Sequence, residues 1–247
     1  MLIDVHAHLD FPQFDADRDA VIERAKKEGV IIINSGLGTT GIKKTLELVE
    51  KYGNVYASLG ITPTEFRVDE IDATIELIRQ NREKIVAIGE VGLDYYWVKE
   101  ENKRKQENVN FQRFIDLSRE LGLPLVIHSR DAEDDLLRIL KEQNIKALMH
   151  CFGGDASLAA DAAKDGHLIS IPANLANSKQ KQRVVKAVPL ESLVLETDAP
   201  YLSPVPKTRN EPANIRKTAE KIAEIKGVDY DTVEAATTAN AKKFFGL

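Results

Sequence analysis

The 247-residue chain is poor in cysteine and lacks long apolar runs and an excess of positive charge, and each of these features excludes a class of protein. Cys151 is the only cysteine, so no disulfide can form within the chain, which suits a reducing compartment. No apolar run is long enough to cross a bilayer, and no signal-like segment precedes Asp4 and His6. We therefore expect a cytoplasmic protein that does not associate with membranes.

Positive charge is also scarce. The chain has 34 Lys and Arg against 39 Asp and Glu, which gives a formal net charge of -5. A protein that binds nucleic acid over a broad face usually carries a basic stripe, so this balance disfavours that mode of binding. Any polyanionic substrate would have to be held locally.

What the chain does contain is a strict alternation of strand-like apolar runs and helix-like amphipathic segments. Strands are predicted at 2–6, 30–35, 54–60, 84–90, 124–128, 146–151, 168–171 and 193–198. Helices are predicted at 16–28, 41–52, 70–83, 103–121, 132–143, 156–165, 177–187 and 212–226, with a last one near 230–243. This pattern and the chain length favour a single (β/α)8 TIM barrel over residues 1–247, with an open doubly wound sheet as the alternative.

Side chains that bind metals stand at the ends of five predicted strands. They are His6, His8, Glu90, His128, His150 and Asp198. Catalytic groups of such barrels lie at the C-terminal ends of the strands, and barrel closure would bring the first and eighth strands together. Side chains alternate along a strand, so His6 and His8 can face one cation. We therefore expect the six side chains to converge on one site.

The mixture of imidazoles and carboxylates is typical of a catalytic site for divalent cations, and the lack of cysteine disfavours a structural zinc site. Six ligands are too many for one catalytic zinc ion with an open position, so two ions are expected, with Glu90 shared between them. We interpret Glu90 and Asp198 as catalytic, because Asp198 would bind the first ion, take a proton from the attacking water, or do both.

A histidine at a strand end is more often a hydrogen-bonded core or surface residue than a ligand. Here four of the five histidines fall at predicted strand ends, which is hard to explain that way. The fifth, His167, precedes the seventh strand, so we expect it at the opposite end of the barrel with a structural role.

Residues Gly36 to Gly41 match the dinucleotide-binding pattern G-x-G-x-x-G. That pattern also needs an acidic residue about 20 positions later, at the end of the next strand. The corresponding segment, Ser58 to Thr62, has none. No nicotinamide cofactor is expected, and the glycines are interpreted as a tight loop that presents backbone N–H groups to the site.

Seven segments, in order, resemble the TatD family of metal-dependent deoxyribonucleases, one of the amidohydrolase-type barrels. They are Asp4 to Asp10, Ile88 to Tyr95, Leu125 to Ala132, His150 to Gly154, Glu196 to Leu202, Arg209 to Pro212 and Asn240 to Leu247. The resemblance covers nearly all of the chain. It implies hydrolysis of DNA phosphodiesters supported by Mg²⁺ or Mn²⁺, with Zn²⁺ as a further option, by a 3′-to-5′ exonuclease that prefers single-stranded ends. It also assigns ligand roles to the same six residues, and a monomer is favoured.

One segment departs from the family pattern. The family usually has Gly-x-His-Pro-His after the third strand, whereas this chain reads Gly60, Ile61, Thr62, Pro63 and Thr64. The missing imidazoles could slow the reaction or change the preferred leaving group. The hydroxyl of Thr62 can still donate a hydrogen bond to a substrate.

Basic and aromatic side chains in the loops near the predicted site are candidates for binding substrate. Arg130, Lys207 and Arg209 would grip phosphate oxygens, and surface salt bridges are the alternative. One or two of the aromatic side chains could stack on an unpaired base, with core packing as the alternative. These are Tyr95, Tyr96, Trp97, Phe152 and Tyr201. The basic run Lys179, Lys181, Arg183 and Lys186 is interpreted as a solvated helix face.

Two other functions stay open at this point. A different hydrolase on the same barrel would cleave an amide, a lactone or a small phosphoester. A catalytically silent scaffold would bind metal without turnover, but it would have no packing reason to bury charged Glu90 and Asp198.

Overall fold

Eight parallel strands pair in chain order and close into a barrel in the computed structural model, which describes residues 1–247. The strands are β1 (Leu2–Ala7), β2 (Val30–Leu37), β3 (Val55–Gly60), β4 (Ala87–Asp94), β5 (Leu125–Arg130), β6 (Ala147–Met149), β7 (Leu168–Ile171) and β8 (Leu193–Leu195). β1 pairs with both β2 and β8. The predicted barrel is confirmed, and the open sheet is excluded.

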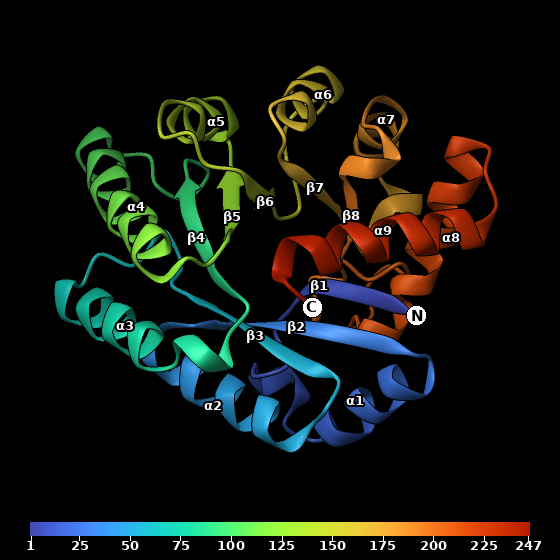
Figure 1. Cartoon of the computed structure of the whole chain (residues 1–247), viewed down its shortest axis with the longest axis horizontal. Helices are drawn as coiled ribbons and strands as arrows, with labels where there is room; N and C mark the ends of the chain where they lie inside the picture. The colour runs from blue at the N-terminus through green and yellow to red at the C-terminus, as the bar shows by residue number, and fades with distance from the viewer.

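Helices surround the strands, and every predicted helix is present (Figure 1). They are α1 (Arg18–Lys27), α2 (Gly38–Lys51), α3 (Val68–Gln80), α4 (Glu101–Leu121), α5 (Glu133–Glu142), α6 (Ala156–Lys164), α7 (Lys179–Ala187), α8 (Ile215–Lys226) and α9 (Tyr230–Phe245). Short 3₁₀ turns lie at Pro12–Phe14, Arg82–Lys84, Ala173–Asn177, Leu190–Ser192 and Pro212–Asn214. None of the helices combines the length and the apolar composition needed to cross a membrane.

Local sequence fixes several of the helix starts. The side chains of Asp155, Ser178 and Asp229 accept backbone N–H groups at the N-termini of α6, α7 and α9. Such a cap satisfies one of the N–H groups that a helix leaves without a partner at its start. These three helix starts are therefore encoded locally.

Apolar side chains fill the inside of the barrel at the N-terminal end of the strands. Residues from six strands meet in one cluster that α9 covers with Ala241 and Phe245. The strand residues are Ile3, Val5, Ile33, Ala87, Val126, Leu148 and Val194. A larger apolar layer lies between the strands and the outer helices. The barrel is thus a packed core, and polar groups can gather only at its other end.

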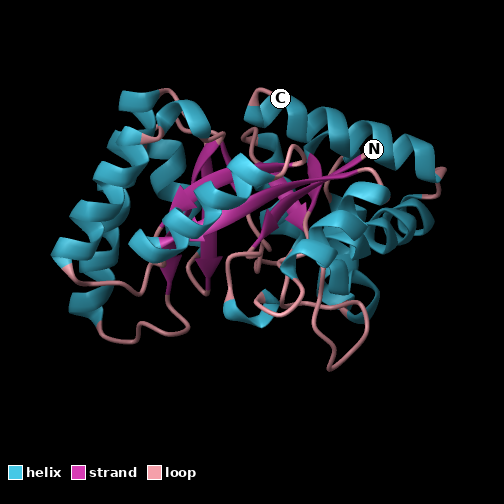
Figure 2. Ribbon diagram, turned by 90° about the horizontal axis from the view of Figure 1, so that it is seen from below, coloured by secondary structure: helices cyan, strands magenta, loops and turns pink.

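The two ends of the barrel differ in their connections. Figure 2 places both chain termini at one end and the longest loops at the other. The longest connection, residues 196–211, joins β8 to the 3₁₀ turn before α8. Because the strands run toward these loops, the residues at the strand ends share a face with them.

β4 differs from its predicted range of 84–90. The 3₁₀ turn Arg82–Lys84 occupies the predicted start, and the strand continues to Asp94. Gly92 allows this, because its φ of 149° suits glycine and a Cβ atom there would collide with the carbonyl oxygen of His128 on β5. Glu90 therefore lies in the middle of β4, and the expectation that it ends the strand was wrong.

The predicted loop at Gly36 to Gly41 was also wrong. β2 ends at Leu37 and α2 begins at Gly38, so no loop separates them. The N–H of Thr39 in the first turn donates to Glu70 Oε1 of α3 at 2.7 Å. A Cβ atom on Gly36 would collide with the side chain of Thr45. The glycines here permit close packing of β2 against α2.

Candidate metal centre

Four histidines meet at the C-terminal end of the barrel. His6 lies near the end of β1, and His8 follows that strand. His128 lies on β5, and His150 directly follows β6. His6 Nε2 is 3.1 Å from His8 Nε2, and the His6 ring stacks on the His150 ring with 3.6 Å between centroids. The structure thus brings together all four histidines that the sequence assigned to the site.

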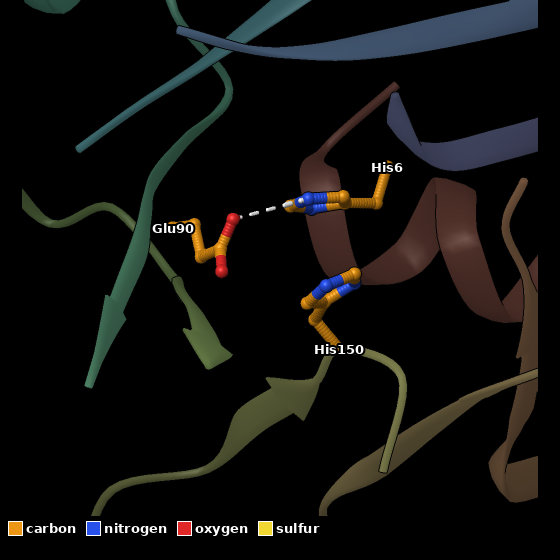
Figure 3. A group of neighbouring side chains, drawn as sticks. All are labelled: His6, Glu90 and His150. Atoms are coloured by element: carbon orange, nitrogen blue, oxygen red, sulfur yellow. Dashed lines mark ion pairs between the residues drawn. The ribbon is translucent and has the colours of Figure 1, made fainter. Parts of the chain in front are cut away.

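Glu90 lies between these imidazoles. Its Oε2 is 3.3 Å from His6 Nε2 and 3.6 Å from His8 Nε2. Its Oε1 is 2.5 Å from His128 Nδ1. Figure 3 shows the Glu90 carboxylate facing the rings of His6 and His150. The two oxygens of this one carboxylate therefore face different histidines.

Asp198 completes the cluster from beyond β8. Its Oδ1 is 3.7 Å from His8 Nε2 and 4.0 Å from His6 Nε2. Its backbone N–H donates to the carbonyl of His6 at 2.9 Å, and Ala199 forms a bridge with Ala7 of β1. Pairing with β1 therefore carries Asp198 into the site, although β8 itself ends at Leu195.

Three of the imidazoles are held from behind by a hydrogen bond. His8 Nδ1 donates to the carbonyl of Ser35 at 3.0 Å, because a carbonyl oxygen can only accept. The His150 Nδ1–H donates to Glu196 Oε2 at 2.8 Å, and His128 Nε2 lies 2.9 Å from Asp94 Oδ2. The other nitrogen of His8 and that of His128 face Glu90, at 3.6 and 2.5 Å. Hydrogen bonds of this kind fix the tautomer and orientation of metal-binding histidines.

The sequence reasoning gave no role to Asp94, Glu196 or Asp4. Asp94 stands four residues after Glu90 in the same strand, so the alternation of side chains could have placed both on one face. Ser170 Oγ also donates to Glu196 Oε2, at 2.6 Å. Asp4 accepts hydrogen bonds from the N–H and the hydroxyl of Thr197 at 2.8 and 2.5 Å, which fixes the segment that carries Asp198. No local sequence signal marks those last contacts.

Burial and charge pairing act against each other in the cluster. Burial would raise the pKa of Glu90, but the charge and hydrogen bond of His128 hold that pKa well below its usual value. Burial would lower the pKa of His128, but Glu90 and Asp94 raise it to about 10. Asp198 has no such close cation, and burial raises its pKa to about 7. Glu196 likewise raises the pKa of His150 to about 9, so Asp198 is the carboxylate of the cluster whose pKa burial raises most clearly toward neutral pH.

The donor atoms fit divalent cations. Two overlapping groups place one atom of each residue within 4.8 Å of the others: His6, Glu90 and His150 form one group, and His6, His8 and Asp198 form the other. His6 Nδ1 is buried and has no hydrogen-bond partner. Imidazole nitrogens and carboxylate oxygens together suit Zn²⁺, Mn²⁺ and Mg²⁺ to different degrees.

The predicted substrate-binding side chains lie in different surroundings. Arg130 and Lys207 are exposed, and neither takes part in any of the ion pairs of the structure. The guanidinium of Arg209 is held by both oxygens of Asp17, at 2.7 and 2.6 Å, and packs over Phe14. Thr62 is exposed.

The predicted aromatic set divides into two groups. Phe152 is fully buried, and Tyr95 donates its hydroxyl to Asp135 at 3.0 Å. Tyr96, Trp97 and Tyr201 are among the large side chains that stay exposed. Only these three can meet a ligand without rearrangement.

Two further expectations concern His167 and Lys181. His167 is buried and accepts the N–H of Ala147, the first residue of β6, so its placement at the opposite end is confirmed. The solvated-face interpretation was wrong for Lys181, which is buried. Its Nζ donates to the carbonyl of Cys151 at 2.8 Å and to that of Phe152. α7 lies against the segment after β6, so this position of the helix faces inward.

Comparison with known proteins agrees with this geometry. A family model described as TatD related DNase matches residues 3–246. The chain belongs to the TatD family. The TatD match extends through every strand and every residue of the cluster, which confirms the family expected from the motifs.

Similar TatD proteins cover nearly the same length. The uncharacterized metal-dependent hydrolase MJ1582 of Methanocaldococcus jannaschii is 41% identical over 98% of this chain and 96% of its own. Human Deoxyribonuclease TATDN3 is 38% identical over 99% of this chain and 94% of its own. The crystal structure of the TatD homolog YjjV from Escherichia coli superposes with a TM-score of 0.89 at 27% identity, covering 100% and 98% of the two chains. This TatD chain is therefore a metal-dependent hydrolase.

Proposed function

We propose that this TatD chain is a deoxyribonuclease that removes nucleotides from the 3′ end of single-stranded DNA. The family match and its likeness to human Deoxyribonuclease TATDN3 support a DNA substrate. The observation that carries the proposal is the position of Glu90, whose two oxygens face His6 and His8 on one side and His128 on the other. A carboxylate shared in this way is typical of two-cation sites that cleave phosphodiesters.

The ligands divide between two cations, for which Mg²⁺ or Mn²⁺ is proposed and Zn²⁺ is the further option. His6, His8 and Asp198, whose donor atoms cluster, would hold one. His150, which clusters with Glu90, and His128, which contacts Glu90, would hold the other, and Glu90 would be shared. Such cations, when bound, polarise a phosphoryl oxygen and make water acidic enough to attack near neutral pH. A pair of cations also offsets the negative charge of the phosphate in an otherwise acidic protein.

The other tasks fall to the chain itself. Asp198 would accept the proton of the attacking water at Oδ1, which faces His6 and His8. Glu90 and Asp198 are the proposed catalytic carboxylates. Glu196 and Asp94 keep the rings of His150 and His128 in one orientation.

Substrate phosphates would be bound by Arg130 and Lys207, and Thr62 would donate a hydrogen bond. Arg209 would have to leave Asp17 before it could bind a phosphate in the same way. No nicotinamide or membrane partner is part of the proposal. That the protein works as a monomer in the cytoplasm stays a prediction.

One observation favours a second candidate function. Thr62 and Thr64 are hydrogen-bonded to each other at 2.9 Å, at the place where the family usually has two histidines. A site without those imidazoles could favour a small phosphoester, an amide or a lactone whose leaving group needs no proton from this side.

The test uses metal-stripped protein reloaded separately with Mg²⁺, Mn²⁺ or Zn²⁺. Single-stranded DNA and RNA labelled at the 5′ end are the substrates, with the Glu90→Gln variant as the inactive control. The proposal predicts a DNA ladder that shortens from the 3′ end, requires the metal and disappears in the variant.

Two results would contradict the proposal. Intact DNA under every metal, together with cleavage of a small ester or amide, would favour the second candidate. Loss of metal-dependent hydrolysis toward all of these substrates would favour a silent scaffold. The double variant Thr62→His with Thr64→His separates the causes, because it should increase DNA cleavage if the missing imidazoles limit the rate.

A further inference from the structure

An exposed aromatic surface lies beside the metal centre, in the connection from β4 to α4. Trp97 is 67% exposed and Tyr96 is 42% exposed, and their rings meet edge to face with 4.9 Å between centroids. The Arg130 guanidinium lies 3.8 Å from the Tyr96 centroid and 5.9 Å from the Trp97 ring. We call these three side chains the aromatic shelf. Neighbouring large aromatic side chains that stay in water mark a binding surface more often than isolated ones do.

Two cationic side chains lie against the rings of the aromatic shelf. Arg130 belongs to no ion pair of the structure, whereas most of the other arginines do. Lys99 adds a second cation, with its Nζ 5.3 Å from the Tyr96 centroid. Two cations and two π faces therefore gather on a molecule whose formal net charge is -5. Such a local cluster of cations and aromatic rings can bind a polyanion on a protein that is acidic overall.

A single carboxylate links the aromatic shelf to the metal centre. Asp94 Oδ1 accepts the N–H of Trp97 at 2.9 Å, and Asp94 Oδ2 lies 2.9 Å from His128 Nε2. The N–H of Tyr95 donates to the carbonyl of Arg130 at 2.8 Å, which ties the ends of β4 and β5 together. The position of the aromatic shelf is thus fixed relative to the ligand His128.

We propose that the aromatic shelf is a base-stacking subsite for single-stranded DNA. An unpaired base next to the scissile phosphate stacks on Trp97, which Tyr96 supports edge to face, while Arg130 and Lys99 bind the flanking phosphate. Bases inside a duplex present no free face to such a surface, so this subsite selects single-stranded ends. The inference rests on the proposed deoxyribonuclease function and assigns its substrate selection to named residues.

Trp97 is the only tryptophan in the chain, so its fluorescence reports directly on the aromatic shelf. The full chain carrying Glu90→Gln, which leaves DNA intact, is titrated with a thymidine oligonucleotide. A chain of abasic sugars with the same number of phosphates is the control ligand. Stacking predicts quenching by the thymidine oligonucleotide and none by the abasic chain, which should also bind about 5- to 100-fold more weakly. Equal binding of the two ligands without quenching would overturn the proposal.

Variants of the otherwise native chain give a second readout. Trp97→Ala should raise KM for single-stranded DNA about 5- to 100-fold with a smaller change in kcat, and Trp97→Phe should restore most of the loss. Arg130→Ala should raise KM as well. Lys105→Ala is the charge-matched control, because Lys105 lies on α4 in an exposed pair with Glu101, and it should leave KM unchanged. An unchanged KM in Trp97→Ala would contradict the stacking subsite.

The two proposals fail in different ways. Cleavage of DNA without any quenching of Trp97 fluorescence would contradict the stacking subsite and still support the deoxyribonuclease. Base-dependent quenching without metal-dependent cleavage of DNA would contradict the proposed deoxyribonuclease function.

Discussion

The four histidines of the candidate metal centre differ in the hydrogen-bond partner that orients each ring. His128 and His150 have a carboxylate partner, His8 has a backbone carbonyl, and His6 Nδ1 has no partner. A carboxylate behind an imidazole makes the ring a stronger donor, so these contacts set metal affinity. Asp94 and Glu196 thus matter to the centre without facing the substrate.

Asp94→Asn tests this role. The asparagine keeps the shape of the side chain but loses the charge that holds His128 Nε2, so affinity for Mn²⁺ should fall about 10- to 100-fold. Isothermal titration of metal-free protein measures it. His167→Gln is the control, because that histidine lies at the opposite end of the barrel and its loss should not change the affinity. Equal affinities of Asp94→Asn and the native protein would contradict the assigned role.

Glu107 makes the stability depend on pH. It is buried on α4, and burial raises its pKa to about 7, above the ordinary value of 4.5. The folded state therefore holds this proton more tightly than the unfolded state. The stabilisation is complete below about pH 4.5 and is lost as the pH rises through about 7.

Glu107→Gln should remove this dependence, because the amide does not titrate. The fold should be kept, because the amide oxygen can still accept the N–H that Asp94 donates to Glu107 Oε1. Between about pH 5 and about pH 8, the free energy of unfolding of the native protein should fall by roughly 2–3 kcal/mol relative to the variant. Urea denaturation at both pH values gives the difference. Parallel pH profiles of the two proteins would show that Glu107 does not titrate in this range.

At the scale of elements, α7 supports the segment that follows β6. The buried Lys181 of α7 donates to the carbonyls of Cys151 and Phe152, which directly follow the candidate ligand His150. Cys151 has a φ of 42°, so the chain turns sharply at this point. The helix thus holds a turn that its sequence alone would not stabilise.

Lys181→Met should loosen this turn. The methionine fills the space but leaves the two carbonyl groups without their donor, so the free energy of unfolding should fall by about 1–3 kcal/mol. Affinity for Mn²⁺ should fall as well, because His150 loses its support. Lys179→Met at the start of the same helix is the matched control, and it should change neither quantity. A variant at Lys181 with native stability, measured by urea denaturation, would contradict this account.

At the scale of the whole molecule, periodicity in the sequence predicted the barrel, because each strand is short, apolar and followed by a helix. The convergence of the six candidate ligands was predictable for the same reason, since strand order and barrel closure place their positions together. The extension of β4 beyond Glu90 was not, because it depends on Gly92 lying against the backbone of β5. The inward position of Lys181 and the pairing of Arg209 with Asp17 likewise depend on neighbours distant in sequence.

Metal removal should lower the free energy of unfolding of the whole barrel, because the residues of the cluster lie on five strands and on the segments that follow them. Ligand that binds only the folded state stabilises it by about 2.7 kcal/mol at a hundred times its Kd. For a chain of this length that corresponds to roughly 5–10 °C in Tm. Differential scanning calorimetry with Mn²⁺ and then with excess chelator measures the shift. The His6→Ala variant should show almost no shift, and a native-sized shift in it would place the cation elsewhere.

The central claim is that six side chains from opposite sides of the barrel form one two-cation site. Anomalous X-ray scattering from crystals grown with Mn²⁺ tests it most directly, because it locates each ion independently of activity. The account predicts two peaks on either side of the Glu90 carboxylate, one beside His6, His8 and Asp198 and the other beside His128 and His150. A single peak would contradict the shared role of Glu90, and no peak among these residues would contradict the metal centre itself.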